Sequence, residues 1–420
     1  MRLPRTLRAW SNNSGFLMHF QDEHTIAVSK PLFSLFCFAS YLLSLSYGST
    51  FLLALLVGAH GGNEQDAGHV ISAAMLSTFA AVLVSGHLSD RLGAARSIAL
   101  CGLALVIANL GFAVSASHQH LLMMFGLLLG VGWGVFYTLG PIIVAMIVPP
   151  AQRSRYFALL SGSMMSGIGS APLVGRLASQ MGLPVTATFY VAALASLIGV
   201  ALFWRMAKPL GQLPDRFSAA VSRLSWQATQ KVLGSRALFP ILMVGLGGAI
   251  FGGLSSFQTS YAQEKALDYS LFFVGFMSAA IAGRMFVAGL VVKRDPYRMS
   301  CLLSGLIVVS LLMFKFVVAG SLGYLLAAIV LGVGYGLTYS VINGLAANEA
   351  PEGTTTQSLL LFSLSYFVGV FGFPFLAGKI IIDNGLSMML LILLGISLLN
   401  WSITLGRLVW RKANVRNAMA

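Results

Sequence analysis

The sequence predicts an all-α polytopic membrane protein, with twelve transmembrane helices in two pseudo-symmetric six-helix halves. Three observations predict this fold class. The composition is apolar and poor in charge, twelve apolar stretches are long enough to cross a bilayer, and one pattern of residues returns 202 positions further along the chain.

The composition places the chain in a lipid bilayer. Hydrophobic residues make up 57% of its 420 residues and charged residues 9%, whereas a soluble domain carries roughly a quarter charged residues. The excess of 26 basic over 12 acidic residues gives a net charge of +14, which would also fit a nucleic-acid binder. The basic residues gather in both tails and in the connections of one side, so the positive-inside rule explains them. We therefore expect no nucleic acid, and a bacterial cytoplasmic (inner) membrane protein with both termini in the cytoplasm.

Each apolar stretch has the length of a spanning helix, about 20 residues. The predicted spans cover residues 31–58, 68–88, 97–116, 121–147, 157–178, 184–206, 237–262, 270–292, 299–319, 321–346, 357–382 and 386–408. The longest polar stretch separates the sixth span from the seventh. The predicted division is a cytoplasmic tail (1–30), an N-terminal six-helix half (31–206), a cytoplasmic linker (207–236), a C-terminal six-helix half (237–408) and a second cytoplasmic tail (409–420).

The repeat indicates that the two halves are homologous. The stretch from Leu129 to Thr138 returns as Leu331 to Ser340, and one constant offset of 202 residues runs through several further spans without a gap. It pairs Tyr137 with Tyr339, and we expect a pseudo-two-fold axis to bring these two residues to opposite walls at similar depth. The same offset pairs Gly130 with Gly332, Pro149 with Pro351, Gly167 with Gly369 and Pro172 with Pro374.

Catalytic and metal-binding patterns are absent from the sequence. The three cysteines, Cys37, Cys101 and Cys301, lie in apolar segments without metal-ligand spacing, and every acidic residue lies in a tail, a loop or a helix edge. We expect no catalytic residue, no metal and no cofactor. A polytopic lipid-modifying enzyme would need clustered carboxylates at the membrane edge. A sensor that signals through its tails stays open as a further alternative, although both tails are short.

The connection after the second span carries the most specific motif. It reads Gly86-His-Leu-Ser-Asp-Arg-Leu-Gly-Ala-Ala-Arg96 and resembles the signature loop of the major facilitator superfamily. The resemblance implies the fold of that family, and it implies a latch that holds the halves closed on the cytoplasmic side. That latch would comprise Gly86, Asp90, Arg91, Gly93 and Arg96. Alternatively, Asp90 caps the next helix and Arg91 only enforces the topology.

The fifth span carries a second motif, Gly167, Ala171, Pro172 and Gly175. It is similar to the antiporter signature of the twelve-helix drug and metabolite efflux group, with Ala171 in place of a glycine. A proline removes a helix hydrogen bond and glycines thin the helix, so we expect a bend in this span. A bend that serves packing alone is the alternative.

The resemblance also indicates which residues would line a central substrate cavity. In that family the first, fourth, seventh and tenth helices form its wall, and here they offer aromatic, amide and hydroxyl side chains. Arg284 in the eighth span adds a charge that is costly in a membrane unless it has a polar partner. The predicted cavity residues are Tyr41, Tyr47, Trp133, Tyr137, Phe257, Gln258, Tyr261, Arg284, Tyr335, Tyr339 and Asn343. Some of these aromatics could instead be interfacial anchors.

These features lead to an expected function. We expect a secondary active transporter that exports a small organic solute by alternating access, coupled to the proton gradient, with a monomer sufficient for the mechanism. The alternative is an uptake permease, a symporter or facilitator, for an organic anion or a metal-chelating metabolite such as a siderophore. An arginine without an intramembrane carboxylate favours neutral or anionic substrates.

Overall fold

The computed structural model describes residues 29–148, 150–211, 225–287, 291 and 294–419. Within these residues, twelve helical segments are long and apolar enough to cross a membrane, so the predicted number of spans is confirmed. Nearly all of the predicted N-terminal tail, and residues 212–224 of the predicted linker, lie outside the described residues.

The first six spans are built from eight helical elements. They are α2 (Lys30–Gly48), η2 (Ser49–Leu52), α3 (Leu53–Gly58), α4 (Glu64–Leu92), α5 (Ala94–Val114), α6 (Gln119–Ile147), α7 (Pro150–Gln180) and α8 (Thr186–Gly211). The first span is a composite of α2, η2 and α3. The second is longer than predicted because Asn63 and Asp66 form a capping box that starts α4 at Glu64.

The last six spans follow a short helix of the linker, α9 (Trp226–Leu233). They are formed by α10 (Leu238–Ser256) with α11 (Gln258–Glu264) after it, α12 (Ser270–Ala282) with η3 (Gly283–Val287), α14 (Pro296–Leu312) with η4 (Met313–Val317), α15 (Ser321–Asn348), α16 (Thr355–Phe367) with η5 (Val368–Gly372) and α17 (Phe373–Asn384), and α18 (Leu386–Met419). Three of these elements, η3, η4 and η5, are π-helical turns.

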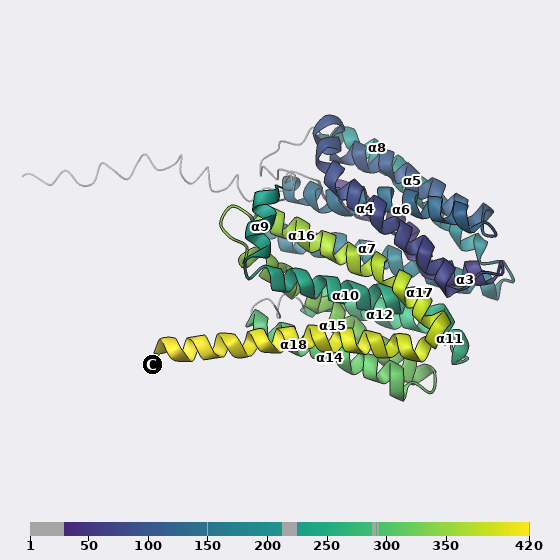
Figure 1. The fold of residues 1–420 in the computed structure, drawn as a ribbon. Coiled ribbons are helices and arrows are strands. Elements are labelled where there is room, and N and C mark those ends of the chain that lie inside the picture. Colours follow the sequence, from purple (N-terminus) through teal and green to yellow (C-terminus); the bar gives the residue numbers. More distant parts are fainter. Residues whose placement is uncertain (1–28, 149, 212–224, 288–290, 292–293, 420) are drawn as a thin grey trace, which may run out of the picture.

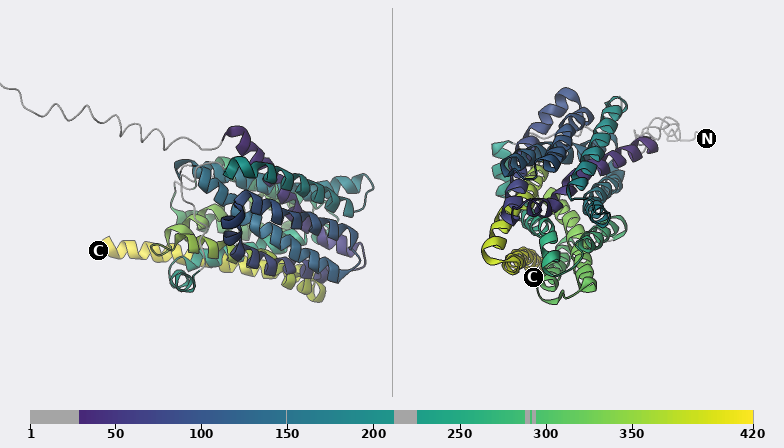
Figure 2. Two further views of the ribbon diagram at one scale, coloured as in Figure 1. Left: turned by 90° about the horizontal axis from the view of Figure 1, so that it is seen from above. Right: turned by 90° about the vertical axis from the view of Figure 1, so that its right-hand side faces the viewer.

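The helices run side by side from one end of the bundle to the other (Figure 1). Helix α9 and the C-terminus lie at one end, which we call the linker face, whereas α3 and α11 lie at the opposite end, the far face. The right-hand view of Figure 2 looks along the bundle and shows the helices nearly end-on. Large apolar side chains such as Leu76, Val84 and Leu194 are exposed on the outside of the spans, as lipid-facing surfaces require.

The two halves meet through a pair of equivalent contacts. Helix α4 packs against α17, and α7 packs against α12. In each pair the second span of one half meets the fifth span of the other half, so exchanging the halves converts one contact into the other. This relation is what a pseudo-two-fold axis between the halves produces.

Candidate functional site

Aromatic rings from both halves meet at the contact between them. Tyr47 stacks on Trp133 with 4.7 Å between ring centroids, and its edge packs against Phe371 of the other half at 5.6 Å. In the C-terminal half, Tyr335 stacks on Phe251 at 5.2 Å. We call these five residues the central aromatic cluster. All five side chains are buried, so the cluster joins the halves through apolar contact.

A hydrogen bond between tyrosines links the halves beside this cluster. The hydroxyl oxygens of Tyr137 on α6 and Tyr339 on α15 are 2.8 Å apart. These residues are the pair that the 202-residue offset relates, and two equivalent residues contact each other only where the pseudo-two-fold axis passes between them. The bond therefore places both hydroxyls next to the axis.

Arg284 extends from the C-terminal half to the N-terminal half at this level. Its Nε donates a hydrogen bond of 3.1 Å to the backbone oxygen of Gly336, and its Nη1 donates to the hydroxyl of Ser161 on α7. The guanidinium carbon also lies 5.4 Å from the centre of the Tyr339 ring. Among the described residues, no carboxylate forms an ion pair with Arg284. In this conformation the charge is therefore held by neutral groups.

The centre of the bundle is closed in this conformation. Side chains of the two halves touch there, since Phe371 packs on Tyr47 with ring centroids 5.6 Å apart and Phe367 packs on Tyr137 at 5.0 Å. The hydrogen bond between Tyr137 and Tyr339 lies beside these ring contacts. The predicted cavity thus has its walls pressed together, and a solute could enter only if the halves separated.

The other predicted cavity residues lie elsewhere. The hydroxyl of Tyr41 donates to Ser170 within the N-terminal half, at 3.0 Å. Gln258 accepts a hydrogen bond from Tyr324, and Tyr261 donates one to the backbone oxygen of Phe314, both inside the C-terminal half. Phe257 is fully buried and Asn343 is partly buried. The structure therefore brings Tyr47, Trp133, Tyr137, Arg284, Tyr335 and Tyr339 together, and it leaves Tyr41, Gln258 and Tyr261 in packing roles within a half.

The residues predicted to form a latch lie at the linker face. Asp90 and Arg91 are exposed in the last turn of α4, and Gly86 is buried one turn earlier. Gly93 joins α4 to α5 with a φ of 81°, a conformation that side chains rarely adopt, so glycine is required at this turn. Arg96 is exposed in the first turn of α5. A latch between the halves stays a prediction.

The motif predicted to bend the fifth span lies within α7, which continues through Pro172 as one helix. Ala171 and Pro172 are buried, and Gly175 faces Leu52 of the first span. Between them and Gly167, Gly169 faces Met277 of α12, whose Cγ would lie 2.6 Å from a Cβ at this position. This part of α7 thus packs closely on both its own half and the other half.

Polar contacts close the far face of the bundle. Arg176 at the end of α7 donates from Nε to Asp268 of the other half at 2.7 Å. Ser260 donates to Glu64 at 3.0 Å, and Ser72 donates to the backbone oxygen of Phe371 at 2.8 Å. All three bonds cross from one half to the other, so we describe this conformation as closed at the far face.

The charge of Asp268 is held firmly. Partial burial raises the pKa of its carboxyl group, but hydrogen bonds from the hydroxyl and backbone of Ser270 and the contact with Arg176 outweigh burial. The net pKa of Asp268 lies below its ordinary value of 3.8. The ion pair with Arg176 therefore persists at neutral pH.

Two residues of the central site, Tyr366 and Ser161, were not predicted from the sequence. Tyr366 on α16 packs on both Tyr137 and Tyr339, with ring centroids 6.1 and 5.8 Å apart. Ser161 on α7 accepts the hydrogen bond from Arg284. Ser161 is one of several serines at helical spacing in this span, so only its contact singles it out. Within the described residues, no group of three or more His, Cys, Asp or Glu side chains could hold a metal ion.

Comparison with known proteins identifies the family of this fold. The family model described as Major Facilitator Superfamily matches residues 33–374. The chain belongs to the major facilitator superfamily, and it is a multi-pass integral membrane transporter and not an enzyme. The resemblance seen in the loop after the second span is thereby confirmed for the family, whereas the efflux subgroup is not settled by this match.

Individual relatives are distant. The MFS-type transporter TwmF of Talaromyces wortmannii is 28% identical over 240 residues, a match that takes in 52% of this chain and 43% of that protein. The chain thus spans less than half the length of this curated relative. The nucleoside transporter NupG superposes with a TM-score of 0.69 at 15% identity, covering 89% of this chain and 98% of that one. The fucose:proton symporter FucP of E. coli gives 0.62 at 17% identity, with the same coverage, and both structures show the fold alone.

Proposed function

We propose that this protein is a secondary active transporter that moves a small organic solute across the bacterial cytoplasmic membrane by alternating access. The observation that carries the proposal is the polar site on the axis, where Arg284, Ser161, Tyr137 and Tyr339 from both halves contact one another. A solute bound there would contact both halves at once. Its binding could therefore alter the equilibrium between conformations open to either side.

Within this proposal, export coupled to the proton gradient comes first, supported by the motif from Gly167 to Gly175 in α7. Uptake of an organic anion or of a metal-chelating metabolite is the second candidate. It is favoured by Arg284, a membrane-embedded cation that no described carboxylate neutralises. The fucose:proton symporter of the same fold is a precedent for protons as the coupling ion.

We further propose that residues 31–206 and 237–408 move as two bodies joined by the linker, with both termini in the cytoplasm, so that the linker face is the cytoplasmic face. A monomer contains both walls of the site, since every bond described above lies within one chain. The exposed pair of Asp90 and Arg91 then lies where a cytoplasmic latch would act, and transport that is unchanged in Asp90→Asn would argue against the latch.

Transport into proteoliposomes tests the proposal. Radiolabelled carboxylates and neutral solutes are presented to both orientations of the protein, with and without an imposed pH gradient. Stimulation by a gradient that drives protons against the solute supports export, and stimulation by protons moving with the solute supports uptake. No solute movement in either orientation, from protein that melts cooperatively, would contradict a transporter site on the axis.

Arg284→Gln gives the residue-level test of the same site. We expect at least a tenfold loss in the rate of transport of an anionic substrate, because a hydrogen bond to a charged group contributes about 1.5–3 kcal/mol. Lys315→Gln is the matched control, since Lys315 is also a cation within a span but bonds to Ser387 near the far face. Equal effects of both substitutions would mean that Arg284 has no special part in transport.

A further inference from the structure

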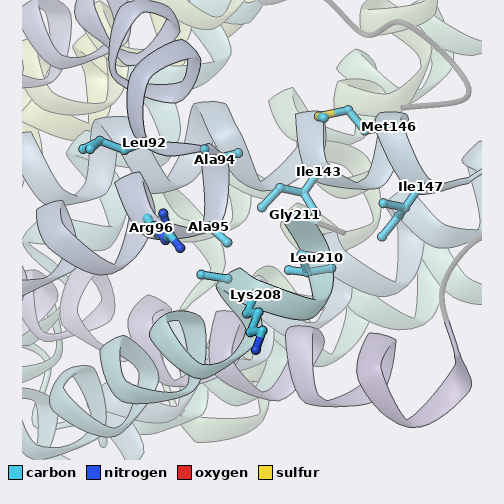
Figure 3. Close-up of a pocket in the computed structure, with 12 residues that line it drawn as sticks. Leu92, Ala94, Ala95, Arg96, Ile143, Met146, Ile147, Lys208, Leu210 and Gly211 are labelled. Atoms are coloured by element: carbon cyan, nitrogen blue, oxygen red, sulfur yellow. The ribbon is translucent and has the colours of Figure 1, made fainter. Parts of the chain in front are cut away.

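A second pocket lies away from the central site, at the linker face of the N-terminal half. It has a volume of about 450 Å³ and is an open pocket between the ends of α4, α5, α6 and α8, with the lining residues drawn in Figure 3. Its walls are mainly apolar, from side chains that include Ile143, Met146, Ile147 and Leu210. The pocket is thus large enough for part of an organic molecule.

Among the described residues that line this pocket, the charged ones are both cations, Arg96 and Lys208. The N-terminus of α5 also opens here, with Gly93 as the capping residue and no acidic side chain in the first turn. The helix dipole adds partial positive charge to that of the two cations. An anion is therefore the chemical class that this lining complements.

In the C-terminal half, the equivalent position at the start of α14, which we call the equivalent corner, is filled by side chains. Asp295, 202 residues after Gly93, accepts hydrogen bonds of 3.0 Å from the backbone nitrogens of Tyr297 and Arg298 at the start of α14. Its second carboxylate oxygen pairs with Arg411 on α18. The C-terminal half thus places a carboxylate of its own between a helix N-terminus and a cation.

Side chains also occupy the remaining space in that half. Tyr297 takes the position of Ala95, and its hydroxyl donates to Glu349, which takes the position of Ile147. Glu349 pairs in turn with the buried Arg407. In the N-terminal half the corresponding residues are Gly93, Ala95 and Ile147, so this corner lacks the aromatic ring and both carboxylates. It has the helix N-terminus and two cations of its own, Arg96 and Lys208.

We propose that this pocket binds the phosphate headgroup of an anionic phospholipid. The phosphate lies against Arg96, Lys208 and the N-terminus of α5. In the other half, the carboxylate of Asp295 lies in the same way against Arg411 and the N-terminus of α14. The apolar part of the lipid packs on Ile143, Met146 and Leu210. The ends of spanning helices lie at the depth of lipid headgroups, which favours a lipid over a soluble phosphate ester. This site is separate from the central one, so it does not depend on the direction or substrate of transport.

Lipid titration of the purified full-length protein in detergent tests this proposal. The melting temperature is followed against added phosphatidylglycerol, phosphatidylcholine of the same chains, and glycerol 3-phosphate, with mass spectrometry of the lipids that copurify. We expect phosphatidylglycerol to stabilise the protein at lower concentration than the other two. In Arg96→Gln/Lys208→Gln its half-saturating concentration should rise about 25-fold, since each of the two cations near an anionic headgroup contributes roughly fivefold.

Two further variants separate a pocket from general attraction to a basic surface. Arg205→Gln removes an exposed cation of α8 that does not line the pocket, and we expect the titration to stay unchanged. Ala95→Tyr keeps both cations but fills the pocket with the side chain that the other half carries, and it should abolish the preference for phosphatidylglycerol. Equal stabilisation by phosphatidylglycerol and phosphatidylcholine would overturn the proposal, as would an unchanged preference in both the double variant and Ala95→Tyr. Saturation by glycerol 3-phosphate at the same concentration would replace the lipid with a soluble phosphate ester.

Discussion

The polar groups at the centre of the bundle form hydrogen bonds with other groups of the protein. Tyr137 and Tyr339 share one hydrogen bond, and Arg284 is held by a backbone oxygen and a serine hydroxyl. Leaving a buried polar group without a partner costs about 1–3 kcal/mol. These mutual bonds therefore stabilise the conformation in which the centre is closed.

Tyr137→Phe and Tyr339→Phe test this bond across the halves. Each removes the same hydrogen bond, so we expect each to destabilise the closed conformation by about 1 kcal/mol, and the double variant to cost little more than one alone. Spin labels on the two halves at the linker face would measure the shift in the distribution of distances. Strictly additive effects would show that the two hydroxyls act independently.

From the repeat, the sequence predicted that Tyr137 and Tyr339 lie at similar depth on opposite walls, but not that their hydroxyls bond to each other. It also predicted that Arg284 needs a polar partner. It did not show that Gln258 and Tyr261 face the inside of their own half. The preceding part of this span, residues 237–254, is apolar around its whole circumference, so hydropathy does not reveal which side of the span meets the other half. Ser161 was missed for a related reason, because a serine within a span leaves no periodic signal.

At the scale of elements, close contact of α4 with α17 determines how tightly the far face closes. A Cβ at Gly68 would lie 2.5 Å from the backbone oxygen of Pro374, and one at Gly378 would lie 2.5 Å from that of Glu64. The absence of side chains lets the two backbones approach.

The span limits were predictable from the sequence to within a few residues. The π-helical turns η3, η4 and η5 were not, since hydropathy is insensitive to the hydrogen-bonding pattern of a helix.

Gly68→Val should force α4 and α17 apart, because backbone atoms cannot yield as a flexible side chain can. We expect the closed far face to lose about 1–3 kcal/mol and transport to slow by at least tenfold. The measurement is the reaction of Ser72→Cys, in a background without the native cysteines, with a membrane-impermeant thiol reagent.

Gly395→Val on α18 is the control for this substitution, since no atom lies within 4 Å of a Cβ at that position. An unchanged reaction rate in Gly68→Val, with unchanged transport, would show that the α4–α17 contact is not essential for closure.

On the scale of the whole molecule, the ion pair of Arg176 and Asp268 fastens the far side of the two halves. The pKa of Asp268 is lowered, so its contribution is present above the ordinary value of 3.8 and is lost only as the pH falls further, through the lowered pKa. Protonation of this group is therefore not expected to drive transport between pH 5 and 8.

Asp268→Asn should raise the population open at the far face at every pH in that range, and the midpoint of the pH–rate profile should stay where it is. The energy involved is small, about 0.2–1 kcal/mol for a partly exposed pair. Fluorescence energy transfer between dyes at the far face would report the opening. A midpoint that moves with this substitution would make Asp268 part of the proton pathway.

The hydrogen bonds that hold Arg284 also have a consequence for the transporter without bound solute. A transporter must return after it releases its cargo, and a bare guanidinium would hinder that passage through a dry interior. Here Ser161, Gly336 and Tyr339 contact the guanidinium of Arg284 when no solute is bound. We therefore expect the protein without solute to change readily between its two conformations. Net movement of solute should then not require a second solute molecule to be carried in the opposite direction.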